Sequence, residues 1–265
     1  MCELFAFSSS SPTRARFSLE EFRLHGCDKG PHCDGWGLAF YEGKFAQIYR
    51  DEKPAAYSEW MSFLLNHEHY SNCVISHIRK ATQGSVSLQN TQPFSRECHG
   101  ARHVFAHNGN LENFKESCVF DNYHPIGDTD SEYAFCMLMD AMKALWDDST
   151  PTLQQRIDVL SEKFSVWSPL GPANILYSDG EYLFAFANRR TQVSGEIEPP
   201  GLYYLSRDEK THKCFNNLVG VELDGHLDSI TLFASVPLST EHWCPFKANE
   251  LIACKDGRIV ARTQL

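Results

Sequence analysis

The stretch CVISHIR at residues 73–79 and the stretch RHVFAH at residues 102–107 decide the fold class of this chain. Each is a short run rich in β-branched or aromatic residues, which is typical of a β-strand. Each run also ends in polar residues, and functional side chains are common where rigid elements end. The two stretches therefore predict two strands with candidate site residues at their ends.

Further strand signals lie on both sides of these runs. Residues 36–41 and 45–50 flank the segment 42–44, Glu-Gly-Lys, which predicts a hairpin. Asp256-Gly257 is a strong hairpin signal because both residue types tolerate the positive φ angles of a tight turn. Other strands or hairpins are expected at residues 2–7, around 178–180, near 202–206 and at 229–236.

Helix signals are fewer. Residues 56–66 are compatible with a short helix. Thr129 followed by Glu132 has the form of a capping box and opens an apolar-rich run that extends to Trp146. A second helix is predicted where apolar residues recur on one face, at Leu153, Ile157, Leu160 and Phe164. The order of elements, with strands first, then two helices and then strands again, predicts an α+β fold with layered, mostly antiparallel sheets. We expect a single domain over residues 2–265.

Length and charge exclude several classes of function. The chain has 265 residues, 42% hydrophobic content and a formal net charge of −10. An acidic chain without Lys/Arg clusters is not attracted to nucleic acid or to an anionic membrane surface. No run reaches the roughly 18 apolar residues of a membrane span. The N-terminus also lacks the basic and apolar regions of a signal peptide. We therefore expect a cytoplasmic protein.

The ten cysteines are expected to be reduced thiols in that compartment. None forms a CxxC pair, so a zinc ribbon has no support. The densest metal-like group is His25, Cys27, His32 and Cys33, whose spacing matches no common zinc pattern. The stretch is rich in Gly and Asp, which favours a loop. We therefore expect no metal and no cofactor.

Cys2 is the strongest candidate for a chemical role. We expect Met1 to be removed, because a small second residue such as cysteine generally permits it, and Cys2 then carries a free α-amine beside its thiol. An α-amine titrates near pH ~7.7–8.0, so part of it is neutral and can accept the thiol proton. One residue would then supply both nucleophile and general base. The alternative is that cysteine stands at this position by chance.

Three polar motifs follow Cys2, each at the end or the start of a predicted element. They are HIRKATQG at residues 77–84, HNG at 107–109 and TDSE at 129–132. Each is weak alone. In this order after Cys2 they match the motifs of the class II (N-terminal nucleophile) glutamine amidotransferases, and the chain most resembles the stand-alone, YafJ-type members. Further matching stretches are residues 34–37, 90–94, 177–180 and 234–238. The resemblance covers nearly the whole chain and implies a four-layer αββα sandwich of the Ntn-hydrolase type.

The resemblance implies a role for the two residues that follow His107. Attack on a side-chain amide creates an oxyanion, which needs hydrogen-bond donors in place. The Asn108 side chain and the Gly109 backbone N–H match the family positions that supply them. Local sequence alone favours a plain Asn-Gly turn here. The implied catalytic residues are Cys2, Asn108 and Gly109, while His77 and His107 match positions that look structural.

The resemblance also implies a binding site for the amino-acid head of glutamine. Arg79 would bind the carboxylate in bidentate fashion. Asp130 would pair with the ammonium group, and Thr82 matches a position that hydrogen-bonds the substrate's backbone groups. The residues alone allow other roles. Arg79 could be a solvated surface arginine, Asp130 a first-turn acid that complements a helix dipole, and Thr82 a loop residue.

The implied activity is amide hydrolysis through a γ-glutamyl-type thioester on Cys2, with the ammonia passing to water or to a separate partner subunit. Glutamine is the default substrate. The alternatives are hydrolysis of another γ-glutamyl compound and a catalytically silent regulatory module. Lys80 and Gln83 stand where larger relatives carry an aromatic residue and a histidine. Those relatives attach a second catalytic domain that uses the ammonia, and we expect none within these residues. The ammonia acceptor and a homodimer stay open.

Overall fold

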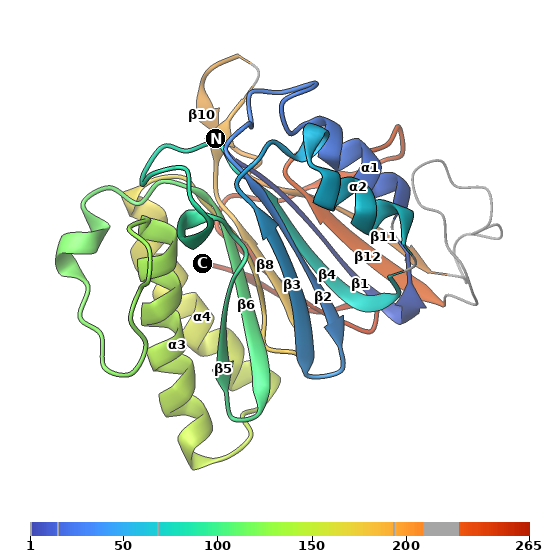
Figure 1. Ribbon diagram of the computed structural model, residues 1–265. Helices are drawn as coiled ribbons and strands as arrows, with labels where there is room; N and C mark the ends of the chain where they lie inside the picture. Colours follow the sequence, from blue (N-terminus) through green and yellow to red (C-terminus); the bar gives the residue numbers. More distant parts are fainter. Residues whose placement is uncertain (1, 15, 68, 193, 209–227) are drawn as a thin grey trace.

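The computed structural model describes residues 2–14, 16–67, 69–192, 194–208 and 228–265. Within them, two antiparallel sheets pack face to face, with helices on both outer faces (Figure 1). The first sheet has seven strands in the order β13-β11-β12-β1-β4-β2-β3. Its strands are β1 (Glu3–Thr13), β2 (Trp36–Glu42), β3 (Phe45–Asp51), β4 (Ser71–Ile78), β11 (Tyr203–Asp208), β12 (Ser229–Ala234) and β13 (Cys244–Pro245).

The second sheet has six strands in the order β15-β14-β8-β7-β6-β5. They are β5 (Phe94–Cys98), β6 (Ala101–Gly109), β7 (Ala173–Ser178), β8 (Leu183–Ala187), β14 (Glu250–Lys255) and β15 (Arg258–Gln264). A short two-stranded ribbon of β9 (Arg190–Thr191) and β10 (Ile197–Glu198) is separate from both sheets.

Two pairs of helices form the outer layers. The first sheet is covered by α1 (Arg16–Leu24) and α2 (Glu59–Asn66), and the ring of Phe22 from α1 lies 5.9 Å from that of Phe5. The second sheet is covered by α3 (Asp130–Asp148) and α4 (Leu153–Trp167), and Phe135 of α3 stacks on Phe105 at 5.3 Å. None of the described helices is long and apolar enough to cross a membrane. Short 3-10 turns lie at Ala55–Tyr57, Leu88–Asn90, Phe114–Ser117 and Ser168–Leu170.

Mostly aliphatic side chains fill the space between the two sheets. Leu4 and Ile75 of the first sheet share one buried cluster with Ala106 and Leu176 of the second. Larger aromatic side chains fill the outer layers, beneath the helices. Side chains alternate between the two faces of a strand. In the central strands one face packs against the other sheet and the opposite face packs against the helices, so both faces are buried. The predicted α+β fold with an αββα arrangement is confirmed.

β1 is the central strand of the first sheet, and it begins directly after Cys2. It pairs with β4 on one side, where Leu4 lies opposite His77. It pairs with β12 on the other side, where Phe5 lies opposite Ala234. A strand held by two ladders cannot slip without exchanging its buried and exposed faces. The sheet therefore fixes the position of Cys2.

The predicted strands and the two long helices are present. The hairpin between β14 and β15 turns at Asp256 and Gly257, where both φ angles are positive, as predicted. Besides the two-residue strands β9, β10 and β13, two longer elements have no counterpart among the predictions. One is the short helix α1, in which Leu19 and Phe22 are buried, and the other is the edge strand β5, which is largely polar. Short or polar segments carry little periodic signal.

The start of α3 follows the predicted capping pattern only in part. The Thr129 side chain accepts the backbone N–H of Glu132, as predicted. The carboxylate of Glu132 turns elsewhere, however. It accepts the Gly127 N–H at 2.6 Å and pairs with Arg96 at 2.7 Å. The loop before α3 is thereby tied to both the helix and the second sheet.

The expectation that every cysteine is a reduced thiol is wrong for the loop that precedes β2. Cys27 and Cys33 form a disulfide, with their Cα atoms 4.8 Å apart. The expectation rested on compartment alone, whereas a tight loop brings these two Cα atoms within bonding range. The other cysteines in the described part of the chain are free thiols. Among the same residues, no group of three or more His, Cys, Asp or Glu side chains could hold a metal ion.

Candidate active site

Cys2 lies against the HIRKATQG segment. Its Sγ accepts the backbone N–H of Lys80 at 3.2 Å and lies 3.4 Å from the Lys80 carbonyl oxygen. Lys80 comes just after β4, the neighbour of β1, so strand pairing itself brings the two together. Burial raises the pKa of the Cys2 thiol, and the Lys80 N–H offsets this only in part. The resting group is a thiol, which needs a base before it can attack.

Arg79 is buried, with only 3% of its surface exposed, so the interpretation as a solvated surface arginine is wrong. Its guanidinium donates to the carbonyl oxygens of Ser85, Gln83 and Gly84 at 2.9, 3.0 and 3.4 Å. A guanidinium carries five N–H donors, so donors are left for a ligand. Burial lowers the pKa of Arg79, and a negative charge at Cys2, as in its thiolate, is the largest opposing influence. Even so, arginine keeps its charge in proteins.

The loop before β2 holds this segment in place. Asp34 accepts the Ala81 N–H on its Oδ2 at 2.7 Å, and its own N–H donates to the Arg79 carbonyl oxygen at 3.1 Å. The Arg79 N–H in turn donates to the Gly35 carbonyl oxygen at 2.8 Å. Gly35 has a φ of 117°, which other residues rarely adopt. Asp34 and Gly35, in the matching stretch at residues 34–37, therefore hold the backbone of Arg79 in place.

Asn108 and Gly109 are the last two residues of β6 and pair with β7, so the Asn-Gly turn interpretation is wrong. A Cβ atom at Gly109 would lie 1.8 Å from the Pro172 carbonyl oxygen, so no other residue fits without a backbone shift. Asn108 is fully buried, and its Nδ2 donates to the Oγ of Ser235 at 3.2 Å. The end of β6 is thus a rigid position for hydrogen-bond donors.

Asp130 is the first residue of α3 and is 4% exposed. Its Oδ2 accepts the Leu111 N–H at 2.8 Å, which ties the helix to the segment that follows β6. Besides the dominant effect of burial, Arg79 lowers and Asp130 raises the pKa of the Cys2 thiol. Both charged groups therefore lie within electrostatic reach of the nucleophile. The helix N-terminus also favours a negative charge at Asp130.

Thr82 and Gln83 lie in the bend that follows Ala81. Thr82 is exposed, and its role in substrate binding stays a prediction. Gln83 donates from Nε2 to Oδ1 of Asn110 at 2.5 Å, which joins the Arg79 segment to the segment after β6. Gln83 is one of the two departures from the family pattern noted in the sequence. This hydrogen bond places Gln83 beside the end of β6, where Asn108 and Gly109 lie.

The two motif histidines are buried, but they differ in their contacts: both ring nitrogens of His77 lack a hydrogen-bond partner in the described part of the chain, whereas His107 bonds on both sides of its ring. Burial lowers the pKa of His77 to about 3, so the ring is neutral at physiological pH. Burial also lowers the pKa of His107. His107 Nδ1 lies 2.9 Å from Ser131 Oγ, and its Nε2 lies 3.4 Å from the Pro172 carbonyl oxygen. The contact with Ser131 joins β6 to α3 and supports the omission of His107 from the catalytic set, while the low pKa of His77 makes it a poor base.

Two buried residues that contact these elements are absent from the predicted set. Glu3 directly follows the nucleophile, and its Oε2 lies 2.6 Å from Nδ1 of His25. Burial alone would raise the pKa of Glu3, but the hydrogen bond and charge of His25, together with the charges of His32 and Arg190, lower it. Ser235 contacts Asn108, as described above. The matching stretch at residues 234–238 is the one sequence signal that includes Ser235, and no local pattern singles out Glu3.

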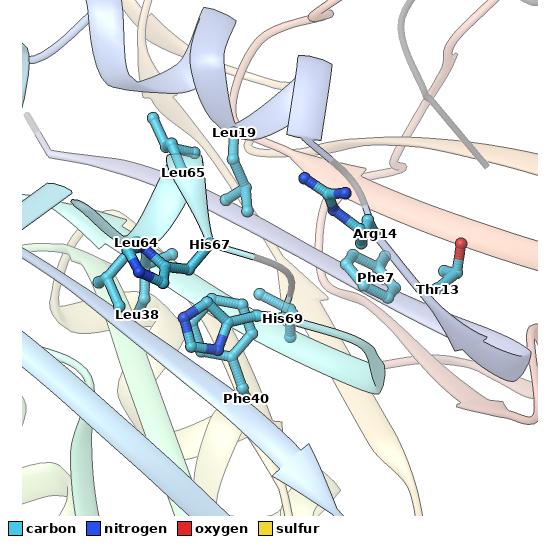
Figure 2. A pocket seen from close by; sticks show the side chains of 11 residues that line it. Phe7, Thr13, Arg14, Leu19, Leu38, Phe40, Leu64, Leu65, His67 and His69 are labelled. Atoms are coloured by element: carbon cyan, nitrogen blue, oxygen red, sulfur yellow. The ribbon is translucent and has the colours of Figure 1, made fainter. Parts of the chain in front are cut away.

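An apolar pocket on the outer side of the first sheet is not part of this site. Figure 2 shows it below α1 and α2, with the His69 ring lying over Phe40. The other lining side chains are mostly apolar, as Phe7 and Leu38 illustrate. The cavity volume is about 20 Å³. That is room for roughly one or two water molecules, and an amino acid does not fit.

The fold and the position of Cys2 agree with the family whose motifs the sequence resembles. Two antiparallel sheets lie between helical layers, and a cysteine directly precedes the central strand. Residues 1–265 match the family model described as "Glutamine amidotransferases class-II", and the chain belongs to this family. The resemblance inferred from the motifs is thereby confirmed.

Individual relatives agree with this assignment. An Escherichia coli protein named "Putative glutamine amidotransferase YafJ" is 32% identical over 262 residues, which cover 98% of this chain and 100% of that protein. A Haemophilus influenzae protein named "Putative glutamine amidotransferase" is 31% identical over 272 residues, with 98% and 86% covered.

Solved structures show the same architecture. A crystal structure described as a "predicted glutamine amidotransferase" from Pseudomonas aeruginosa superposes with a TM-score of 0.72 at 28% identity, covering 98% of this chain and 100% of that one. A glutamine phosphoribosylpyrophosphate amidotransferase from B. subtilis has a TM-score of 0.59 at 13% identity, covering 99% of this chain and 49% of its own. The second likeness is one of fold alone.

Proposed function

We propose that this protein hydrolyses the side-chain amide of glutamine through a thioester on Cys2, after Met1 has been removed. The observation that carries the proposal is the environment of the Cys2 thiol. The Lys80 N–H holds its sulfur at 3.2 Å, and the charges of Arg79 and Asp130 both act on it. A nucleophile beside one positive and one negative buried group suits a substrate with an amino-acid head, because the head carries a carboxylate and an ammonium group that these charges can bind.

Each step uses a group already described. The neutral α-amine of Cys2 takes the thiol proton, and the sulfur attacks the side-chain carbonyl carbon of glutamine. Asn108 and the Gly109 N–H donate to the oxyanion that forms. Its collapse breaks the C–N bond, and the proton held by the amine leaves with ammonia. Water then attacks the thioester by the same route and releases glutamate, so glutamine and water give glutamate and ammonia.

The leaving-group side decides between the two enzymatic functions. A γ-glutamyl peptide presents the same head as glutamine and differs in releasing an amino acid instead of ammonia. The deciding experiment measures kcat/KM of Met1-free protein for glutamine, asparagine and a γ-glutamyl peptide. Preference for glutamine supports the proposal, with ammonia passing to water or to a partner protein. Preference for the peptide supports γ-glutamyl hydrolysis, and no turnover of any substrate favours a regulatory module.

Removing either charge at the substrate head should weaken catalysis strongly. We expect Arg79→Ala and Asp130→Ala each to lower kcat/KM for glutamine by about 30-fold or more, since an unpaired charge in a partly desolvated site costs roughly 2–5 kcal/mol. Asp130→Asn keeps an acceptor for the Leu111 N–H and tests the charge alone. Arg50→Ala is the control, because Arg50 also donates to a backbone carbonyl oxygen but outside the motif. Wild-type kcat/KM in both site variants would remove these residues from the substrate site.

Activity should rise with pH through the titration of the α-amine. The amine must be neutral to act as base, and its pKa is ordinarily about 7.7–8.0. Burial raises the pKa of the Cys2 thiol, so the thiol keeps its proton over this range. We therefore expect kcat/KM to fall about tenfold per pH unit below the amine pKa and to level off above it. Steady-state rates of Met1-free protein between about pH 6 and pH 9 measure this. A flat profile would contradict the amine as base.

A further inference from the structure

We propose that Ser235 is a positioning residue that orients the amide of Asn108 toward the reacting centre. The inference rests on the proposed function, in which Asn108 stabilises the oxyanion. Ser235 follows β12 and is 1% exposed. Its Oγ accepts the Leu4 backbone N–H at 3.0 Å and the Asn108 Nδ2 at 3.2 Å. One hydroxyl therefore joins the strand that begins beside the nucleophile to the strand that ends in the oxyanion donors.

Among the described residues, Ser235 is the hydrogen-bond partner of the Asn108 side-chain amide. The Oδ1 of Asn108 is buried and has no hydrogen-bond partner in the part of the chain that the structure describes. The contact with Ser235 is therefore the hydrogen bond that orients the amide among these residues. An amide nitrogen carries two N–H groups, so occupying one sets the direction of the other. A donor that needs no reorganisation during the reaction stabilises an oxyanion best.

Ser235 is itself held firmly enough to act in this way. Its N–H donates to the Leu4 carbonyl oxygen at 3.0 Å, and its own carbonyl oxygen accepts from Nη1 of Arg190. The charge of Arg190 also acts on the buried carboxylate of Glu3. Hydrogen bonds thus join the Ser235 backbone to Leu4 of β1 on one side and to Arg190 of β9 on the other. Its hydroxyl then has a fixed position relative to both Cys2 and Asn108.

A buried serine with no such role is available for comparison. Ser76 lies in β4 and is fully buried, and its Oγ donates to the Gly37 carbonyl oxygen at 3.2 Å. Loss of either hydroxyl removes a buried hydrogen bond and lowers thermal stability. Only loss of the Ser235 hydroxyl also frees a proposed oxyanion donor. Ser76→Ala is therefore the matched control for Ser235→Ala.

The experiment is a double-mutant cycle on Met1-free protein with glutamine as substrate. We expect Ser235→Ala to lower kcat by about tenfold or more with KM little changed, because the lost interaction acts mainly in the transition state. Asn108→Ala should lower kcat by about 10²–10³-fold. In the Asn108→Ala background, Ser235→Ala should then have almost no further effect, since Ser235 acts through Asn108. Ser76→Ala should keep the wild-type kcat.

Two results would overturn the role of Ser235. One is an equal loss of kcat from Ser235→Ala in the wild-type and Asn108→Ala backgrounds. The other is unchanged kcat in Ser235→Ala while Asn108→Ala is impaired. If Ser235→Ala does not fold, Ser235→Cys takes its place in the cycle, because a thiol is a weaker hydrogen-bond partner of similar shape.

A crystal structure of the Ser235 variant gives a readout that needs no turnover. We expect the Asn108 amide to rotate or to occupy several conformers in this variant, and to stay single in Ser76→Ala. An amide that keeps one unchanged orientation without the hydroxyl would refute the inference. Failure of the proposed function looks different, because Asn108→Ala would then retain the wild-type kcat or the wild-type protein would not turn over.

Discussion

Replacing Cys2 by serine is expected to lower glutamine turnover by about 10⁴-fold or more while the fold survives, by analogy with other hydrolases that lose their nucleophile. The hydroxyl has nearly the shape of the thiol, so its contact with the Lys80 N–H can persist. It is much less acidic, however, and intrinsically less nucleophilic than the thiol, so the same α-amine activates it less well. Glutamate release by Met1-free protein measures the loss, and thermal unfolding verifies the fold.

Cys118→Ser is the matched control for this prediction. Cys118 is also a half-buried free thiol, and burial raises its pKa to about 11. It lies among the side chains that pack between the second sheet and its helices, and its Sγ donates to the Phe114 carbonyl oxygen at 3.3 Å. We expect this variant to keep the wild-type rate. Turnover that survives Cys2→Ser but is lost in another cysteine variant would assign a different nucleophile.

An N-terminal extension that cannot be removed is expected to lower turnover by about 10²–10⁴-fold, the usual contribution of a general base. The extension converts the α-amine of Cys2 into an amide, which accepts no proton. The raised pKa of the thiol makes this loss severe, because little thiolate forms without a base. Folding should be normal, since β1 gains its ladders from β4 and β12 whatever precedes Cys2. Initial rates and thermal unfolding of the extended chain measure both properties.

The control is the same extension with a protease site that leaves Cys2 as the first residue. Cleavage should restore the full rate from one and the same preparation. Full activity before cleavage would show that another group takes the proton. His77 would be a poor replacement, because burial lowers its pKa to about 3. His107, which bonds to Ser131, would then need to be tested first.

The parts of the fold that the sequence predicts are those with strong local signals. The segments at 73–79 and 102–107 form β4 and β6 because β-branched and aromatic side chains suit strands that are buried on both faces. The Thr129 cap fixes the start of α3. Since these elements place their ends together, the ordered motifs also predict which side chains meet around Cys2. Within the motif at residues 77–84, the backbone N–H of Lys80 contacts the thiol.

What the sequence does not predict depends on contacts between distant segments. The Cys27–Cys33 disulfide arises from a loop geometry that composition does not reveal. Ser235 reaches Asn108 only because β12 pairs with β1 and the two sheets then stack. The Asn-Gly pair resembles a turn locally, yet strand pairing with β7 keeps it extended. In each case a long-range contact overrides or supplements the local pattern.

The most direct test of the central claim is to map the thiol that a glutamine analogue modifies. Met1-free protein is treated with diazo-oxo-norleucine, an electrophilic analogue of glutamine, and the modified peptide is identified by mass spectrometry. The proposed function predicts one adduct per chain, on Cys2, with Cys73, Cys118 and Cys244, the other half-buried free thiols in the described part of the chain, unmodified. Excess glutamine should slow the labelling. An adduct on another cysteine while Cys2 remains free would contradict the account.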